Sequence, residues 1–329
     1  MLGAAVSILL VASSVAGAQY VDRSPHTERW VTVSEGVRLH VLDWGGAGQP
    51  LLLVPGFGFN AHVYDDLAPE LTRDFRVVAV TIQGWPPSDA PPSGYTYDNV
   101  AREIRAVLDT LAISRVVLIG HSFGGTVITR VAERFPERVR GLVYLDGALQ
   151  GAARDSAFDR RPFMRPAPTS RPPDTTLAAA VATQAAYARQ YFYGTWTPAL
   201  EAELWAHYYG QADSAIARRD KLVQRFGKED PVDAQQPDFT HVVQPALSIC
   251  AMATPKTLYP WLTPDSARWV VAQAYADTVL RPFLRRECAT FARQAPHGQT
   301  VMLDSGHYIF IDRHADVVRL IRSFVARLP

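Results

Sequence analysis

A serine and a histidine stand among glycines in residues 116–127, which read VVLIGHSFGGTV. The apolar run predicts a strand, the residues after it predict a helix, and Gly120 to Gly124 between them fit the pattern G-x-S-x-G. A sharp turn there strains the serine backbone, and its flanking positions must be glycine because a Cβ would collide with the strand and helix nearby. We therefore interpret Ser122 as a nucleophile; the alternative is a turn that only packs a helix on a strand.

A serine hydroxyl is a poor nucleophile at neutral pH and needs a base. Among nine histidines, His307 lies in VMLDSGHYIF, after the last predicted strand and before the final helix. From there it can reach the strand ends where Ser122 emerges, although a histidine in a surface loop is the alternative. His121 adjoins Ser122 but is expected to point the other way across the turn and to shape the pocket.

The negative oxygen that forms during acyl transfer needs two hydrogen-bond donors placed in advance. The amide of Phe123, at the start of the helix, is the first candidate. Pro55-Gly56-Phe57-Gly58 follows the apolar run 51–54, and the amide of Phe57 on this turn is the second. A plain glycine-rich loop is the alternative.

Strands and helices must hold these residues in place. Residues 29–44 alternate apolar and polar side chains around Glu35-Gly36, which predicts a hairpin. Unalternating apolar runs predict buried parallel strands at 51–54, 77–81, 116–119, 142–145, 246–250 and 300–303. Apolar residues at three- and four-residue spacing predict helices at 97–111, 125–135 and 314–328. This alternation predicts a mostly parallel sheet between helices.

No convincing strand occurs between the sixth and seventh strands. A Pro- and Arg-rich stretch, RRPFMRPAPTSRPP, is followed by Ala- and aromatic-rich helical stretches. We interpret residues 149–244 as a helical cap inserted into a core made of residues 19–148 and 245–329.

From about residue 30 to residue 328 the chain resembles the α/β-hydrolase superfamily, in its capped serine esterase and haloperoxidase-like branch. The motifs that carry the resemblance are Gly120 to Gly124, Pro55 to Gly58 and DSGHYIF. It implies an α/β-hydrolase fold and a catalytic triad built on Ser122 and His307. One departure is TIQGWPPSD, where Gln83 and Pro86 replace the usual Arg and Gly, which predicts an altered pocket wall.

The acid of the triad is the second departure, because no carboxylate closely follows the seventh strand. Asp146 ends GLVYLD, one strand after the nucleophile, and some relatives take their acid from this point. Asp265 comes second, although Thr263-Pro264-Asp265 is also typical of a helix start. Asp304 is the third candidate, and we favour Asp146.

A serine with a histidine base suits attack at a carbonyl, so we predict hydrolysis of an ester, lactone or thioester through an acyl-enzyme. No metal or organic cofactor is needed. We expect a small or medium apolar substrate, because aromatic residues are predicted around Ser122 and in the cap. The residues predicted to line the pocket are Phe59, His121, Trp85 and Tyr308. The cap aromatics are Tyr191, Phe192, Trp196 and Trp205. The alternatives are carbon–carbon bond hydrolysis or perhydrolysis by the same triad, and a binding protein without catalysis.

The composition and the N-terminal residues indicate which partners and which cellular location to expect. With 33 basic and 32 acidic residues the net charge is +1, which makes nucleic acid an unlikely partner. Residues 1–18 are uncharged and end in Ala-Gly-Ala, which predicts a cleaved signal peptide and a secreted or periplasmic protein without stable membrane association. A misplaced start in a cytoplasmic protein and a membrane anchor are the alternatives. Cys250 and Cys288 form a disulfide or stay as buried thiols; the oligomeric state is open.

Overall fold

The computed structural model describes residues 22–148, 157, 160–164, 177–191, 196–208 and 237–329. The predicted signal peptide lies outside these residues. Within them, no helix combines the length and the apolar character needed to cross a bilayer.

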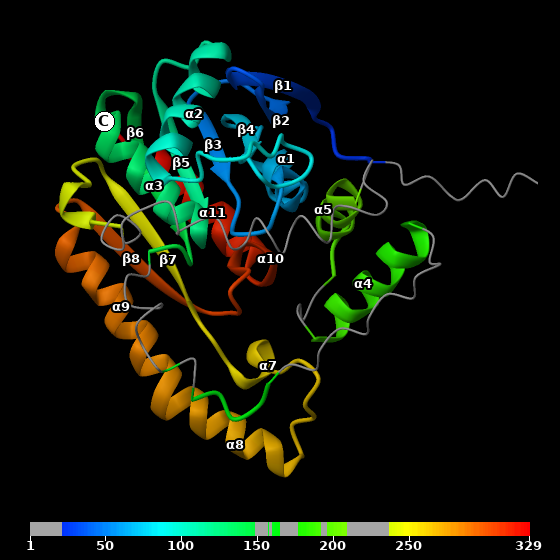
Figure 1. The fold of residues 1–329 in the computed structure, drawn as a ribbon. Helices are drawn as coiled ribbons and strands as arrows, with labels where there is room; N and C mark the ends of the chain where they lie inside the picture. The colour runs from blue at the N-terminus through cyan, green and yellow to red at the C-terminus, as the bar shows by residue number, and fades with distance from the viewer. Residues whose placement is uncertain (1–21, 149–156, 158–159, 165–176, 192–195, 209–236) are drawn as a thin grey trace, which may run out of the picture.

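One eight-stranded sheet carries the described core (Figure 1). Its strands follow the order β1-β2-β4-β3-β5-β6-β7-β8, and β2 runs antiparallel to β1 and β4 while every other pair is parallel. They span β1 Thr27–Ser34, β2 Val37–Gly45, β3 Pro50–Val54, β4 Arg76–Thr81, β5 Val116–His121, β6 Val139–Leu145, β7 Ala246–Met252 and β8 Gly298–Asp304. The predicted hairpin and the six predicted apolar runs are confirmed as these strands.

Helices cover both faces of the sheet, which explains why its central strands are apolar on both sides. One face packs against α2 (Tyr97–Thr110), α3 (Phe123–Arg134) and the end of α9 (Arg281–Gln294). The other face packs against η1 (Ala61–Tyr64), α1 (Leu67–Leu71), α10 (Ile309–Asp312) and α11 (His314–Val325). The remaining short elements are η2 (Pro136–Arg138), η4 (Phe239–His241), α7 (Pro255–Leu258), α8 (Ala267–Tyr275) and the π-helical turn η5 (Ala276–Leu280). The predicted fold class is thus confirmed.

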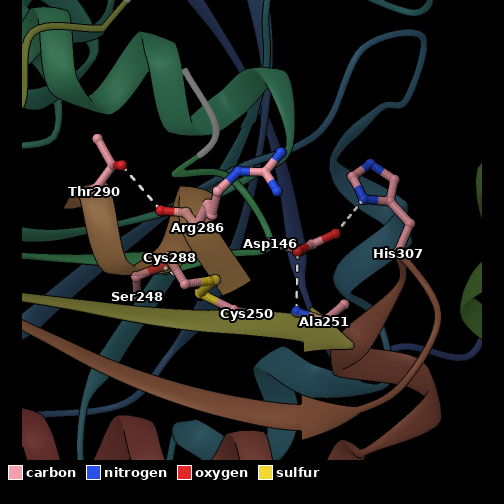
Figure 2. Close-up of a disulfide and its surroundings, with 8 residues drawn as sticks. All are labelled: Asp146, Ser248, Cys250, Ala251, Arg286, Cys288, Thr290 and His307. Carbon is pink, nitrogen blue, oxygen red and sulfur yellow. Dashed lines mark hydrogen bonds and ion pairs between the residues drawn. A yellow bond between two sulfur atoms is a disulfide. The ribbon is translucent and has the colours of Figure 1, made fainter. Parts of the chain in front are cut away.

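A disulfide joins Cys250 of β7 to Cys288 of α9, 38 residues apart in the chain (Figure 2). The sequence left open whether the two cysteines form a disulfide or stay as buried thiols, and in the structure they form the disulfide. The bond ties α9 to the strand that contains Ala251, a residue of the site described below.

Two α-helices of the predicted cap fall within the described residues. They are α4 (Leu177–Tyr191) and α5 (Pro198–Tyr208), and both lie between β6 and β7 in the chain. Helix α5 packs on η1, where the Asn60 side chain donates a hydrogen bond to the Glu203 carbonyl over 3.1 Å. The limits proposed for the cap, 149 and 244, stay a prediction because most residues between them lie outside the part of the chain that the structure describes.

A buried carboxyl group on α2 makes stability depend on pH. Glu103 is only 3% exposed, and its Oε1 accepts a hydrogen bond from Asn99. Burial raises the pKa of Glu103 from 4.5 to about 8. Because the folded protein holds this proton more tightly than the unfolded chain, the stability that it contributes is complete below pH 4.5 and is lost as the pH rises through about 8. We expect Glu103→Gln to remove this loss, which amounts to about 5 kcal/mol.

Urea unfolding of both proteins at pH 5 and pH 8.5 measures the effect. The free energy of unfolding of the variant should exceed that of the wild type at pH 8.5 and not at pH 5. Glu137→Gln, which changes an exposed carboxylate of η2, is the matched control and should follow the wild type at both values. Equal pH dependence in the wild type and Glu103→Gln would contradict the assignment.

Candidate active site

Ser122 lies at the turn between β5 and α3, with φ +51° and ψ −121°. This positive φ is unusual for a residue with a side chain and is held by close packing around the turn. A Cβ on Gly120 would lie 2.4 Å from the Gly124 carbonyl oxygen, and one on Gly124 would lie 2.3 Å from that of Val54. The predicted need for glycine on both sides of Ser122 is therefore confirmed.

His307 and Asp146 meet at the carboxyl end of the sheet. Asp146 follows β6 directly, and its Oδ2 lies 2.6 Å from Nδ1 of His307. The other oxygen, Oδ1, accepts a hydrogen bond of 3.0 Å from the amide of Ala251, so the carboxylate is held between β7 and the imidazole (Figure 2). Because a carboxylate only accepts, Nδ1 carries the proton and Nε2 keeps its lone pair for another donor.

The other two candidate acids do not contact His307. Asp304 pairs with Arg281 at 2.8 Å. Asp265 is exposed in a turn, and the predicted helix start was wrong in detail because α8 begins at Ala267, with Ser266 as its N-cap. Only the residue after β6 is brought to the imidazole, since β6 lies between β5 and β7 in the sheet.

The loop that carries His307 is held by a residue that sequence reasoning missed. Asp312 of α10 accepts hydrogen bonds through Oδ2 from the amide of Gly306, at 2.8 Å, and from the hydroxyl of Ser305, at 3.3 Å. A Cβ on Gly306 would lie 2.8 Å from the same oxygen. The only signal in the sequence is a carboxylate five residues after His307, and a carboxylate at that position would suit an exposed helix surface equally well.

His121 was predicted in the substrate pocket, and the structure corrects this. It is 1% exposed, its ring packs against those of His307, Tyr308 and Phe310, and it does not line the cavity described below. Burial and the neighbouring His307 hold the pKa of His121 well below its usual range, so the ring is neutral. Its Nε2 donates to the His307 carbonyl over 3.0 Å, which fixes the backbone of the base.

The predicted aromatic wall is only partly present. Trp85 is fully buried in the core, because the segment from Gln83 folds inward: the Gln83 side chain donates to the carbonyl of Gly94. Phe59 is half-buried, contacts Tyr308 with 5.5 Å between ring centroids, and does not line the cavity; Tyr308 does. The structure therefore places Trp85 in the core and not in the pocket, while Phe59 lies outside the cavity that the described residues form.

The two cap aromatics whose side chains the structure describes, Trp196 and Trp205, do not line this cavity either. Trp196 and Trp205 both donate a hydrogen bond to Glu201 of α5, at 2.8 and 3.2 Å, and Trp196 also packs against the core on the α1 and α11 side of the sheet. The side chain of Tyr191 and all of Phe192 lie outside the described residues.

The turn after β3 lies directly against the serine. A Cβ on Gly56 would lie 2.7 Å from Nδ1 of His121 and 3.3 Å from Cβ of Ser122. The ring centroids of Phe57 and Phe123 lie 5.5 Å apart, so the two residues predicted to supply amide donors are neighbours. Their role as donors stays a prediction.

A cavity of about 940 Å³ opens beside these groups, and Ser122, Asp146 and His307 all line it. Its other walls come mainly from the ends of β7 and β8, from α7 and from the turn that follows it. Apolar and charged residues share these walls, and they include Phe163, Leu258, Tyr259, Trp261, Leu280 and Leu284, together with Arg161, Lys256, Asp304 and Arg313. A few charged groups in an apolar wall are typical of a small-molecule site.

The model of the alpha/beta hydrolase fold family matches residues 49–314, which include the serine turn and the His307 loop. The chain belongs to the α/β-hydrolase family. Among curated proteins, this α/β-hydrolase is 31% identical over 206 residues to the AB hydrolase superfamily protein YisY of Bacillus subtilis, covering 60% of this chain and 75% of that one. The family is therefore shown by two independent matches.

Other relatives match over shorter stretches. A 2-hydroxy-6-oxononadienedioate/2-hydroxy-6-oxononatrienedioate hydrolase of Paraburkholderia phymatum is 35% identical over 142 residues, which is 40% of this chain and 49% of that one. For the first curated relatives, the matched stretch spans less than half of the relative's own length. The crystal structure of an E-2-(acetamidomethylene)succinate hydrolase shares the fold, with a TM-score of 0.63, 20% identity and coverage of 92% of this chain and 99% of that one.

Proposed function

We propose that this α/β-hydrolase is a serine hydrolase that cleaves a carboxylic ester, or a related lactone or thioester, of a small to medium apolar substrate. Ser122 is the nucleophile, His307 the base and Asp146 the acid. The observation that carries the proposal is the 2.6 Å hydrogen bond between His307 Nδ1 and Asp146 Oδ2 in the wall of a cavity that Ser122 also lines.

In this reaction, Nε2 of His307 takes the proton of Ser122 while the serine oxygen bonds to the carbonyl carbon of the substrate. The carbonyl oxygen becomes negative and receives hydrogen bonds from the amides of Phe57 and Phe123. Asp146 stays ionised and stabilises the imidazolium. The imidazolium then protonates the departing alcohol, and the same steps with water release the acid and restore Ser122.

The choice of an acyl substrate follows from the nucleophile. A serine oxygen with a histidine base suits attack at a carbonyl carbon, whereas a carboxylate nucleophile is the group that can displace at an sp³ carbon. The apolar side chains of Leu258, Tyr259 and Leu284 in the cavity wall support a substrate with an apolar acyl or alcohol part.

Labelling with an alkyl fluorophosphonate tests the proposal directly. We expect the folded protein to gain the mass of one adduct, mapped by peptide sequencing to Ser122, because only an activated serine reacts readily. The same protein unfolded in urea is the control and should gain none. A folded protein that never gains the adduct mass would instead be a binding protein without serine catalysis.

Carbon–carbon bond hydrolysis by the same triad is the second candidate. The similarity to the Paraburkholderia phymatum hydrolase favours it. A panel of p-nitrophenyl esters of increasing acyl length, assayed beside a vinylogous 1,5-diketone acid, distinguishes the two. Higher kcat/KM for the esters supports the first proposal, and the reverse result supports the second.

We also propose export, supported by the uncharged leader and by the bonded pair Cys250–Cys288, since disulfides persist mainly in oxidising compartments. The intact mass of the protein recovered from the source cells tests it. Loss of residues 1–18 is the expected result.

A further inference from the structure

Four ligand-type side chains meet far from Ser122 in the sequence, where the chain enters the sheet. Asp22 and His26 precede β1, His62 belongs to η1, and Asp65 directly follows η1. One ligand atom from each of these residues lies within 4.8 Å of all the others. The proposed hydrolysis uses none of them.

The spacing of the histidine nitrogens and carboxylate oxygens, with both oxygens of Asp65 included, fits a tetrahedral metal site. Nε2 of His26 lies 2.9 Å from Oδ2 of Asp22 and 3.6 Å from Oδ1 of Asp65. Nδ1 of His62 lies 3.3 Å from Oδ2 of Asp22 and 2.8 Å from Oδ2 of Asp65. Four ligands at the usual zinc distances of about 2.0–2.1 Å from a tetrahedral centre stand about 3.3 Å apart. The four measured separations bracket that value.

The two histidine rings do not supply enough hydrogen-bond donors for the two carboxylates of this cluster. The side chain of Asp65 is only 4% exposed, yet its Oδ1 accepts no hydrogen bond among the described residues. Each ring nitrogen that faces the cluster carries at most one proton, and Asp22 and Asp65 compete for both protons. A buried carboxylate oxygen without a donor is costly, whereas a cation at the centre would satisfy all four residues at once.

Neighbouring groups hold the side chains in this arrangement. The other oxygen of Asp22 accepts a hydrogen bond from the amide of Ser24 over 2.9 Å, which turns Oδ2 toward the cluster. The rings of His26 and Trp44 pack edge to face with centroids 5.4 Å apart, and His40 stacks on His62 at 5.6 Å. Such support of ligands by outer residues is typical of metal sites.

We propose that Asp22, His26, His62 and Asp65 bind one Zn²⁺ ion. Two imidazole nitrogens and two carboxylates suit zinc, whereas calcium and magnesium prefer oxygen ligands alone. Four protein ligands leave no open position, so the ion is structural. The bound ion joins the segment before β1 to η1. The element η1 follows the Phe57 turn and contacts α5 through Asn60.

Metal titration of the full-length protein tests the site. After treatment with a chelator and dialysis, we expect the wild type to bind one Zn²⁺ per chain by calorimetry and elemental analysis, with a rise in Tm. Asp65→Asn and His26→Gln should each weaken zinc binding by at least about 100-fold. Neither Ca²⁺ nor Mg²⁺ at the same concentration should raise the Tm.

His314→Gln is the matched control, because His314 pairs with one carboxylate, Glu70, at 2.8 Å without further ligands; it should bind zinc like the wild type. X-ray absorption of the zinc-loaded wild type, which needs no variant to fold, should show two imidazole ligands. A folded wild type that binds no zinc, zinc binding unchanged in both ligand variants, or a spectrum without imidazole would each overturn the proposal.

Discussion

Replacing Ser122 by alanine should lower kcat for p-nitrophenyl ester hydrolysis by on the order of 10⁶-fold, the size of loss seen when a triad nucleophile is removed. The expected cause is loss of the attacking oxygen, while the amides of Phe57 and Phe123 and the cavity stay in place. Any residual rate above that in water would come from these remaining groups. Steady-state kinetics with an active-site titration measure the change, and a rate within tenfold of the wild type would place the nucleophile elsewhere.

The backbone at Ser122 provides a control for folding. Because φ is +51° at this residue, a side chain there costs about 1–3 kcal/mol that glycine avoids. Ser122→Gly should therefore be as inactive as Ser122→Ala and more stable to urea than either Ser122→Ala or the wild type. Loss of activity accompanied by lower stability in both variants would point to misfolding rather than to a missing nucleophile.

Asp146→Asn should lower kcat by about 10⁴-fold, as when the acid of a serine triad becomes an amide. The two hydrogen bonds of Asp146 explain why. The amide of Ala251 donates to Oδ1, so the asparagine oxygen must take that side and its NH₂ group must face Nδ1 of His307. The imidazole then carries its proton on Nε2, where it cannot accept the proton of Ser122.

Asp304→Asn and Asp265→Asn are the matched controls for this prediction. Asp304 is paired with Arg281, and Asp265 is exposed, so neither change alters the protonation of His307. Asp265→Asn, a surface change outside the cavity wall, should keep kcat within about threefold of the wild type. Asp304 lines the cavity, so Asp304→Asn is expected only to keep a kcat far above that of Asp146→Asn. If Asp304→Asn or Asp265→Asn lost activity while Asp146→Asn kept it, the acid would have been assigned to the wrong strand.

Local rules decide the strands, the serine turn and the helices predicted at 97–111, 125–135 and 314–328, so the sequence could predict these. The helices α7 and α9 were not predicted. The run 116–119 is apolar without alternation, so it had to be a strand covered on both faces, and the glycines at 120 and 124 had to admit the close backbone contacts that the structure shows. The stripe of Val100, Ile104 and Val107 fixed the buried side of α2 in the same way.

The pocket wall could not be predicted in this way, because burial depends on which segments fold over each other. Trp85 packs on Phe57 and His121 precedes Ser122 directly, but both side chains are buried. An aromatic side chain suits a pocket and a core equally well, and nothing in its local sequence separates the two.

The sequence by itself determined the order of the predicted strands and helices along the chain, the turn at Ser122 and the place of His307 after the last strand. Each of these depends on residues that are neighbours in the chain. Only the tertiary structure decided which carboxylate meets His307, that Cys250 pairs with Cys288, and that Asp22 and His26 lie beside His62 and Asp65. Those contacts join residues from 36 to 161 positions apart, so the packing of strands, helices and loops sets them rather than any local preference.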